Sequence, residues 1–217
     1  LRTHVMGVLN LTPDSFSGDG LHHDLGAAVA RAQQMQDEGA DVLDIGAEST
    51  RPNSRPITED EELERLLPVL RAVVAGLRIP VSVDTRKPQV AQRAIAEGAS
   101  LINDVWGLRA ESAMAPVIAA HPEVAVVVMH NQHGTDYPEL LSDIALRLRE
   151  SLVIAAQAGI AETQVVCDPG FGFGKTPARN LEVLRRLREL RSVGRPLLVG
   201  LSRKSTIGAV LGGAPVD

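Results

Sequence analysis

Residues 80–104 read PVSVDTRKPQVAQRAIAEGASLIND, and this stretch decides the fold. It opens with the apolar run Pro80–Asp84 and closes with another, Leu101–Asp104, as buried parallel strands do. Between them Pro88–Glu97 reads as a helix, because a proline in the first helical turn gives up no hydrogen bond. Gly98 then supplies a left-handed cap. The stretch therefore predicts a strand, a helix and a second strand parallel to the first.

The alternation of strand and helix continues in both directions along the chain. Further predicted strands are His4–Leu9, Val42–Gly46, Ala125–Met129, Val165–Asp168 and Leu197–Gly200. Further predicted helices are Asp24–Glu38, Thr58–Leu77, Glu111–Ala120, Pro138–Ala158 and Ala178–Arg191, with a seventh beginning near Ser205. Asp24 and Thr58 are residue types that cap helix starts, and glycines follow several helix ends, at Gly39, Gly159 and Gly194.

Seven β/α units imply a parallel sheet with helices outside it, which two architectures satisfy. A doubly wound sheet needs only five or six strands, whereas a (β/α)₈ TIM barrel needs eight and typically about 250 residues. The 217 residues contain no linker or change in composition. We interpret the chain as one TIM-barrel domain over residues 1–217, with the eighth β/α unit missing from this sequence.

Composition narrows the class of protein. The net charge of −5 argues against a nucleic-acid binder, which usually has a basic surface. Cys167 is the only cysteine, so no intrachain disulfide can form, and a reducing compartment is favoured. No apolar run reaches the roughly 18–20 residues that span a bilayer. We expect a cytoplasmic protein that acts on small molecules, without nucleic acid or membrane as partner; oligomeric state stays open, with a homodimer as one option.

Polar residues gather where the predicted strands end. Because parallel strands place their carboxyl ends on one face, which is the catalytic face of barrels, these residues form one candidate site. They are Asn10, Glu48, Thr50, Arg51, Asp84, Asn103, Asp104, His130, Asp168, Ser202, Arg203 and Lys204, together with the apolar Met129 that precedes His130.

Some of these residues suit an anionic substrate and a metal. Asn10 offers an amide oxygen, a hard ligand that Mg²⁺ accepts beside phosphate oxygens. Thr50 offers a hydroxyl, and Arg51 a guanidinium fork that matches phosphate. Lys204 is a cation beside the site, and Ser205 lies where a helix begins, a position that favours an anion.

Others suit a flat, nitrogen-rich ring. Asp84 and Asp168 could each pair through two hydrogen bonds with an amino-pyrimidine edge, as carboxylates pair with guanidinium. Asn103 both donates and accepts, so it can read a heterocycle that does both. Met129 and Phe173 could cover the face of such a ring.

Three other sequence features do not indicate a phosphate-binding loop, a metal site or a nucleophile. Residues 170–176 resemble a phosphate-binding loop, but Pro169 occupies the position of its first glycine. His130 and His133 lack a third metal ligand at suitable spacing, so we expect a surface loop there. Cys167 lies inside a strand, which favours a packing role over a nucleophile.

Six motifs in order resemble those of the dihydropteroate synthases. They are MGVLNLTPDSFS at residues 6–17, DIGAESTRP at 44–52, SVDT at 82–85, INDV at 102–105, DPGFGFGK at 168–175 and GLSRKS at 200–205. The resemblance runs along the whole chain. That family folds as a (β/α)₈ barrel, which favours the barrel over the doubly wound sheet.

The resemblance implies a transferase of folate biosynthesis. Such enzymes join 6-hydroxymethyl-7,8-dihydropterin diphosphate to 4-aminobenzoate, giving 7,8-dihydropteroate and diphosphate. Diphosphate leaves first, and the aniline nitrogen then attacks the cationic pterin methylene. Sulfonamides, which mimic 4-aminobenzoate, are expected to compete. The family's Arg-x-His pair on strand eight, which binds diphosphate, has no counterpart up to Asp217.

The resemblance also assigns roles. Asn10 becomes the ligand of Mg²⁺. The expected catalytic residues are Asp14, Arg51, Asp84 and Lys204. The expected substrate-binding residues are Phe16, Thr50, Pro52, Asp84, Asn103, Met129, Asp168, Phe173, Lys204 and Ser205. Two alternatives remain: a non-catalytic pterin-binding protein, and the pterin module of corrinoid methyltransferases, which would need neither the loop at 12–16 nor the motif at 202–205.

Overall fold

The computed structural model describes residues 2–12, 24–49 and 55–213. Contacts along the chain divide it into two compact units, residues 1–103 and residues 104–217. The single domain expected from the sequence therefore stays a prediction.

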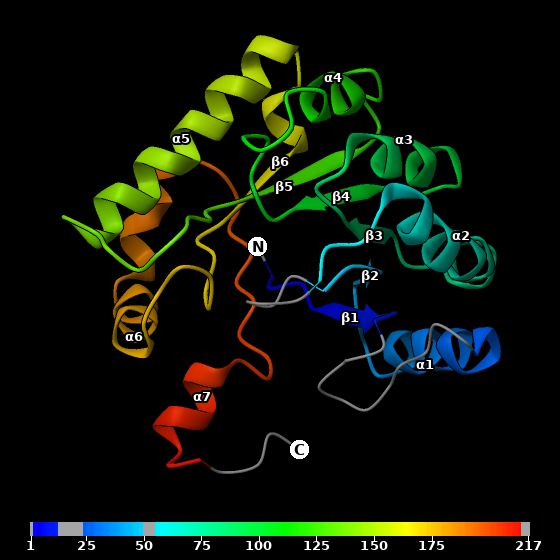
Figure 1. The fold of residues 1–217 in the computed structure, drawn as a ribbon, viewed down its shortest axis with the longest axis horizontal. Helices are drawn as coiled ribbons and strands as arrows, with labels where there is room; N and C mark the ends of the chain where they lie inside the picture. The colour runs from blue at the N-terminus through cyan, green and yellow to red at the C-terminus, as the bar shows by residue number, and fades with distance from the viewer. Residues whose placement is uncertain (1, 13–23, 50–54, 214–217) are drawn as a thin grey trace. The chain divides into compact units, whose positions relative to one another are not determined.

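The first unit is a parallel sheet with helices along it (Figure 1). Its elements are β1 (Met6–Asn10), α1 (Leu25–Asp37), β2 (Val42–Gly46), α2 (Glu59–Gly76), β3 (Val81–Asp84), α3 (Pro88–Ala96) and β4 (Leu101–Asp104). Each strand pairs in parallel with the next one along the chain. Helix α1 packs on β1, β2 and α2, and α2 packs on α3. The predicted stretch 80–104 thus folds as expected.

Predicted caps explain where the helices of the first unit begin and end. The side chain of Asp24 accepts the Ala27 N–H at 2.9 Å, and the Thr58 hydroxyl accepts the Glu61 N–H at 3.2 Å. Gly39 and Gly98 follow α1 and α3 with φ of 103° and 99°, which side chains rarely adopt. The chain therefore turns back toward the sheet at these positions.

The second unit repeats the alternation. Its elements are α4 (Met114–Ala119), β5 (Ala125–Met129), α5 (Leu140–Ala158), the 3₁₀ helix η2 (Glu162–Gln164), β6 (Val165–Asp168), α6 (Pro177–Arg185), the 3₁₀ helix η3 (Leu187–Val193) and α7 (Ser205–Val210). Strands β5 and β6 are parallel, with Met129 opposite Asp168. Helix α5 packs on both strands and on α4, α6 and η3 (Figure 1). The helix predicted over Ala178–Arg191 divides into α6 and η3.

The strand predicted at Leu197–Gly200 is wrong: a single parallel bridge, Cys167 to Leu197, takes its place. Cys167 N–H donates to the Pro196 carbonyl at 2.9 Å, and Leu198 N–H donates to the Cys167 carbonyl at 2.8 Å. The next donor in this ladder would be residue 169, which is a proline and has no N–H. Pairing therefore stops after one bridge.

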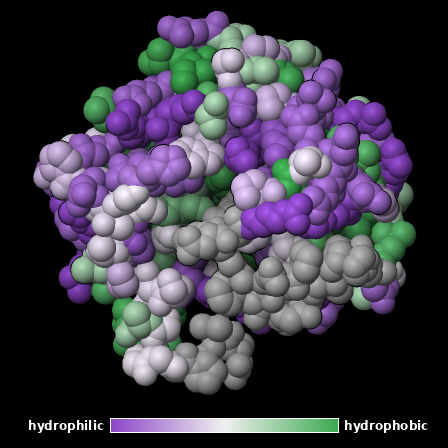
Figure 2. Space-filling view, viewed as in Figure 1, coloured by the Kyte–Doolittle hydropathy of each residue, from purple (hydrophilic) through white to green (hydrophobic). Residues whose placement is uncertain are grey.

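The coloured part of the face drawn in Figure 2 is largely hydrophilic, with hydrophobic residues in small separate patches. Exposed apolar side chains on α5 include Leu146 and Val153. Within the described ranges, no helix has the length and apolar character needed to cross a membrane.

Candidate active site

In the first unit, three of the predicted site residues lie at the same level near the ends of β1, β3 and β4, with Gly46 of β2 between the first two. Asn10 pairs with Gly46, Gly46 with Asp84, and Asp84 with Asn103. Their side chains belong to the last row of the sheet, because strand residues in register point to the same face. The structure thus brings together an amide oxygen, a carboxylate and a second amide.

Gly46 leaves a space between two oxygen donors in this row. A Cβ added there would lie 3.6 Å from Oδ1 of Asn10 and 3.8 Å from Oδ2 of Asp84. The glycine was not singled out from the sequence, although its place at a strand end between two polar strand ends is a readable signal. An amide oxygen and a carboxylate bordering one small space suit a hard cation that keeps most of its ligands from water and phosphate.

Beneath this row lies a buried carboxylate that sequence reasoning missed. Asp44 accepts the Ser82 hydroxyl at 2.5 Å and the Asn103 Nδ2 amide at 3.1 Å. Burial raises the pKa of Asp44, and the two hydrogen bonds oppose this rise. Because Asp44 engages the Asn103 amide nitrogen, it fixes the orientation of that amide. The sequence does not indicate that Asp44 orients Asn103, because this role depends on partners that lie on other strands.

In the second unit, Asp168 ends β6 beside Met129 at the end of β5, and both are buried. Its Oδ1 accepts the Gly170 N–H at 2.7 Å. Burial raises the pKa of Asp168 to about 6, while this hydrogen bond and the charges of Lys204 and Lys175 act in the opposite direction.

Phe173 and Lys204 lie together in the same unit. The Lys204 ammonium is 4.4 Å from the centroid of the Phe173 ring, within the range of a cation–π contact. Asn180, which the sequence did not indicate, accepts the Gly172 N–H at 2.9 Å and donates to the Thr206 hydroxyl at 2.8 Å. The turn after β6 is thereby joined to α7, which begins directly after Lys204.

Two strand-end residues have roles other than those first considered. Asp104 accepts the Trp106 N–H at 2.8 Å and the Leu108 N–H at 2.7 Å, so its carboxylate shapes the turn after β4. The surface loop predicted at His130 is wrong there, because His130 is fully buried and its Nδ1 lies 3.0 Å from the Lys175 ammonium. Cys167 is buried as predicted, and burial raises its thiol pKa to about 11.

The remaining predicted residues divide into two groups. Ser205 is the exposed first residue of α7. Outside the described residues lie Asp14, Phe16, Thr50, Arg51 and Pro52. In the described ranges, no three His, Cys, Asp or Glu side chains cluster so that they could hold a metal ion together.

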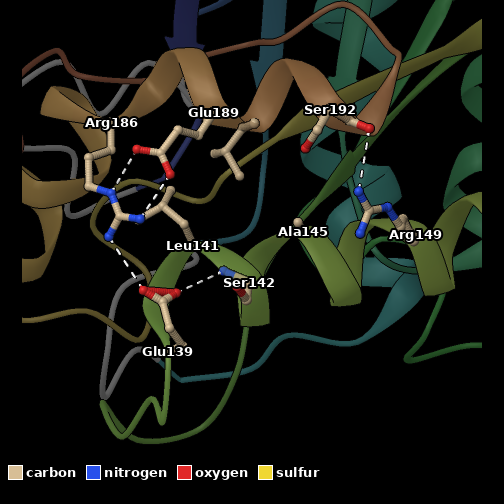
Figure 3. Close-up of a pocket in the computed structure, with 9 residues that line it drawn as sticks. Glu139, Leu141, Ser142, Ala145, Arg149, Arg186, Glu189 and Ser192 are labelled. Carbon is tan, nitrogen blue, oxygen red and sulfur yellow. Dashed lines mark hydrogen bonds and ion pairs between the residues drawn. The ribbon is translucent and has the colours of Figure 1, made fainter.

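A pocket of about 340 Å³ lies elsewhere, between α5 and η3 (Figure 3). Its charged groups satisfy one another: Arg186 bonds to Glu189 at 2.8 Å and to Glu139 at 3.4 Å. The Arg149 guanidinium donates to the Ser192 carbonyl at 3.4 Å. None of the predicted site residues lines this pocket.

Comparison with known proteins gives consistent results. Residues 6–216 match the family model described as pterin binding enzyme. The chain is 45% identical over 210 residues to the dihydropteroate synthase of Clostridium beijerinckii, covering 97% of this chain and 78% of that protein.

Solved structures of dihydropteroate synthases resemble this chain as well. A dihydropteroate synthase from Clostridium difficile, crystallised in the presence of pteroic acid, superposes with a TM-score of 0.92 at 46% identity, covering 97% of this chain and 80% of that one. The Xanthomonas albilineans enzyme in complex with 7,8-dihydropteroate gives 0.87 at 39% identity, covering 99% and 77%. These likenesses confirm the (β/α)₈ barrel as the fold class, in place of the doubly wound sheet.

Proposed function

The chain belongs to the dihydropteroate synthase family of pterin-binding enzymes, and we propose that the residues at its strand ends carry that family's reaction. It is a transferase of folate biosynthesis that joins 6-hydroxymethyl-7,8-dihydropterin diphosphate to 4-aminobenzoate. One observation in each unit supports the assignment of residues: the shared row of Asn10, Asp84 and Asn103 in the first unit, and the buried Asp168 at the end of β6 in the second.

The first chemical step breaks the bond between the pterin methylene carbon and a diphosphate oxygen. The electron pair leaves with diphosphate, so positive charge develops on the pterin. The carboxylates of Asp84 and Asp168 stabilise that charge electrostatically. Asp168 also accepts two hydrogen bonds from the amino-pyrimidine edge, and Asn103, held by Asp44, reads the ring. The pterin also contacts Met129, Phe173 and Lys204.

The second step forms the carbon–nitrogen bond. The aniline nitrogen of 4-aminobenzoate attacks the methylene carbon and then loses a proton. The family resemblance alone assigns the residues on this side: Ser205 to the benzoate carboxylate, Thr50 and Arg51 to the diphosphate or the 4-aminobenzoate, and Asp14, Phe16 and Pro52 to the covering loops.

Asn10 and Asp84 fit a Mg²⁺ ion, because their oxygens border the space above Gly46. With only one or two protein oxygens, such an ion draws its other ligands from water and substrate phosphate, as Mg²⁺ commonly does. When bound, Mg²⁺ would neutralise the negative charge that collects on departing diphosphate.

Gly46→Ala tests this metal position. The added methyl group meets only ordinary contacts of 3.6–3.8 Å, so the melting temperature should stay unchanged. It occupies the space between the two oxygens, so the Mg²⁺ concentration that gives half-maximal turnover should rise about tenfold or more, corresponding to about 1.4 kcal/mol. Gly76→Ala, at the end of α2 with nothing within 4 Å, is the matched control. An unchanged Mg²⁺ requirement in Gly46→Ala would exclude this position.

The reaction itself is tested by diphosphate release. With Mg²⁺ and the pterin diphosphate, release should depend on 4-aminobenzoate and should be inhibited competitively by a sulfonamide. A non-catalytic pterin-binding protein would bind the pterin without releasing diphosphate, and a corrinoid methyltransferase module would ignore 4-aminobenzoate. A cytoplasmic location and a homodimer stay predictions.

A further inference from the structure

The turn that follows β6 closes around one buried ammonium group. Lys175 Nζ donates to the carbonyl oxygens of Gly170 at 2.9 Å and Phe173 at 3.0 Å, and lies 3.0 Å from Nδ1 of His130. Lys175 is 8% exposed and His130 is fully buried. Three acceptors from two separate segments of the chain thus converge on a single nitrogen.

Only lysine can satisfy these three acceptors from one atom. Two carbonyl oxygens and a ring nitrogen have no proton to share among themselves, whereas an ammonium carries three donors. Arginine spreads its donors over a planar fork and does not bring three of them to one point. The residue type at position 175 is therefore dictated by the contacts around it.

His130 is a neutral acceptor in this arrangement. While Lys175 is charged, Nδ1 accepts one of its protons and the ring proton is on Nε2, a buried atom that has no hydrogen-bond partner among the described residues. Burial, with the charges of Lys175 and Arg109, lowers the pKa of His130 to about 3. Burial likewise lowers the pKa of Lys175 to about 7, and the Asp168 carboxylate opposes this fall.

The turn held by Lys175 carries groups assigned to the pterin. Gly170 N–H bonds to Asp168 at 2.7 Å, and the Phe173 ring faces Lys204. Gly170, with φ of 70°, lies so close to β5 that a Cβ there would be 1.9 Å from the His130 carbonyl oxygen. The position of the turn is thus set against the end of β5, and Lys175 fastens it from inside.

We propose that Lys175 is a positioning residue for pterin binding: it holds the Gly170–Phe173 turn on His130, and thereby holds Asp168 and Phe173 in their binding positions. This inference rests on the proposed function. It goes further by giving a task to Lys175 and His130, to which the proposed function gives none.

Calorimetric titration with a pterin ligand tests the proposal. Lys175→Met leaves three buried acceptors unpaired and should raise the pterin Kd about tenfold or more, and Lys175→Arg should not rescue it. Lys87→Met is a control matched in burial: Lys87 is 9% exposed, donates to the Ile57 carbonyl at 2.8 Å and pairs with the buried Glu62 at 2.6 Å. It should lower the melting temperature and leave the pterin Kd unchanged.

A milder pair of variants keeps the test decisive if Lys175→Met fails to fold. His130→Asn places an amide oxygen near the position of Nδ1 and should keep the Kd within about twofold of wild type, whereas His130→Leu removes the acceptor and should raise the Kd several-fold. Equal affinities for these two variants would overturn the proposal.

Combining Lys175→Met with Asp168→Asn distinguishes an effect of Lys175 on the position of Asp168 from a general loosening of the fold. If Lys175 acts through Asp168 as well as Phe173, adding Lys175→Met to Asp168→Asn should raise the Kd by clearly less than Lys175→Met does in the wild type, because coupled residues are not additive. Full additivity would overturn the proposal. Wild-type protein that binds no pterin would instead contradict the proposed function, so the two failures are distinguishable.

Discussion

Asp168→Asn is expected to weaken pterin binding about ten- to a hundredfold while the protein remains folded. The carboxylate that accepts two hydrogen bonds from the ring would become an amide that presents a donor to a donor, and such buried mismatches cost about 1–3 kcal/mol. Asp168 is 6% exposed, so water cannot compensate. Isothermal calorimetry measures the change. Unaltered affinity would remove Asp168 from this role.

Two controls accompany this substitution. Asp104→Asn changes an equally buried strand-end carboxylate whose two oxygens are bonded to the backbone, so stability should fall without loss of pterin affinity.

The second control measures the pterin affinity of the wild type at decreasing pH. The Asp168 pKa is raised to about 6, so below that pH the carboxylate is lost and wild-type affinity should fall by up to about tenfold per pH unit. Asp168→Asn should show no such dependence.

Arg51→Ala is expected to cut turnover by well over tenfold and leave the melting temperature nearly unchanged. A guanidinium that neutralises departing diphosphate acts in the transition state, where each 1.4 kcal/mol lost lowers the rate about tenfold. The competing interpretation is a surface pair with Glu48. However, Glu48 already accepts the Ile57 N–H at 3.2 Å and pairs with Lys87 at 3.2 Å.

Steady-state formation of dihydropteroate, with saturating 4-aminobenzoate and Mg²⁺, measures this effect in protein that includes the strand-eight unit. Arg55→Ala is the matched control, because Arg55 is an exposed arginine four residues further along. It should retain wild-type turnover. Wild-type turnover in Arg51→Ala would contradict the role given to Arg51, since surface ion pairs contribute only about 0–1 kcal/mol.

Local chemistry made most of the fold predictable. Apolar runs, an Asp or Thr before a helix and a glycine after it act within a few residues, and the structure places caps at Asp24 and Thr58 as expected. The prediction of a seventh strand was wrong because the pairing of that segment depends on a residue far away in the sequence. Pro169, on the neighbouring segment, removes the donor that would extend the ladder.

The places of Asn10, Asp84 and Asp168 at strand ends were predictable from the sequence, and their roles in the site stay predictions. The site was not predictable where one side chain orients another. Asp44 matters because Ser82 and Asn103 donate to it across the sheet. Lys175 and His130 matter because they meet 45 positions apart in the sequence. Such pairs are fixed by register and packing, which no local pattern encodes.

A crystal structure with a bound pterin tests the central claim most directly. The amino-pyrimidine edge should lie against the Asp168 carboxylate, with two hydrogen bonds of about 2.7–3.2 Å. The ring should also contact Asn103 and Lys204. A pterin bound away from Asp168, for example in the pocket between α5 and η3, would contradict the assignment of the active site.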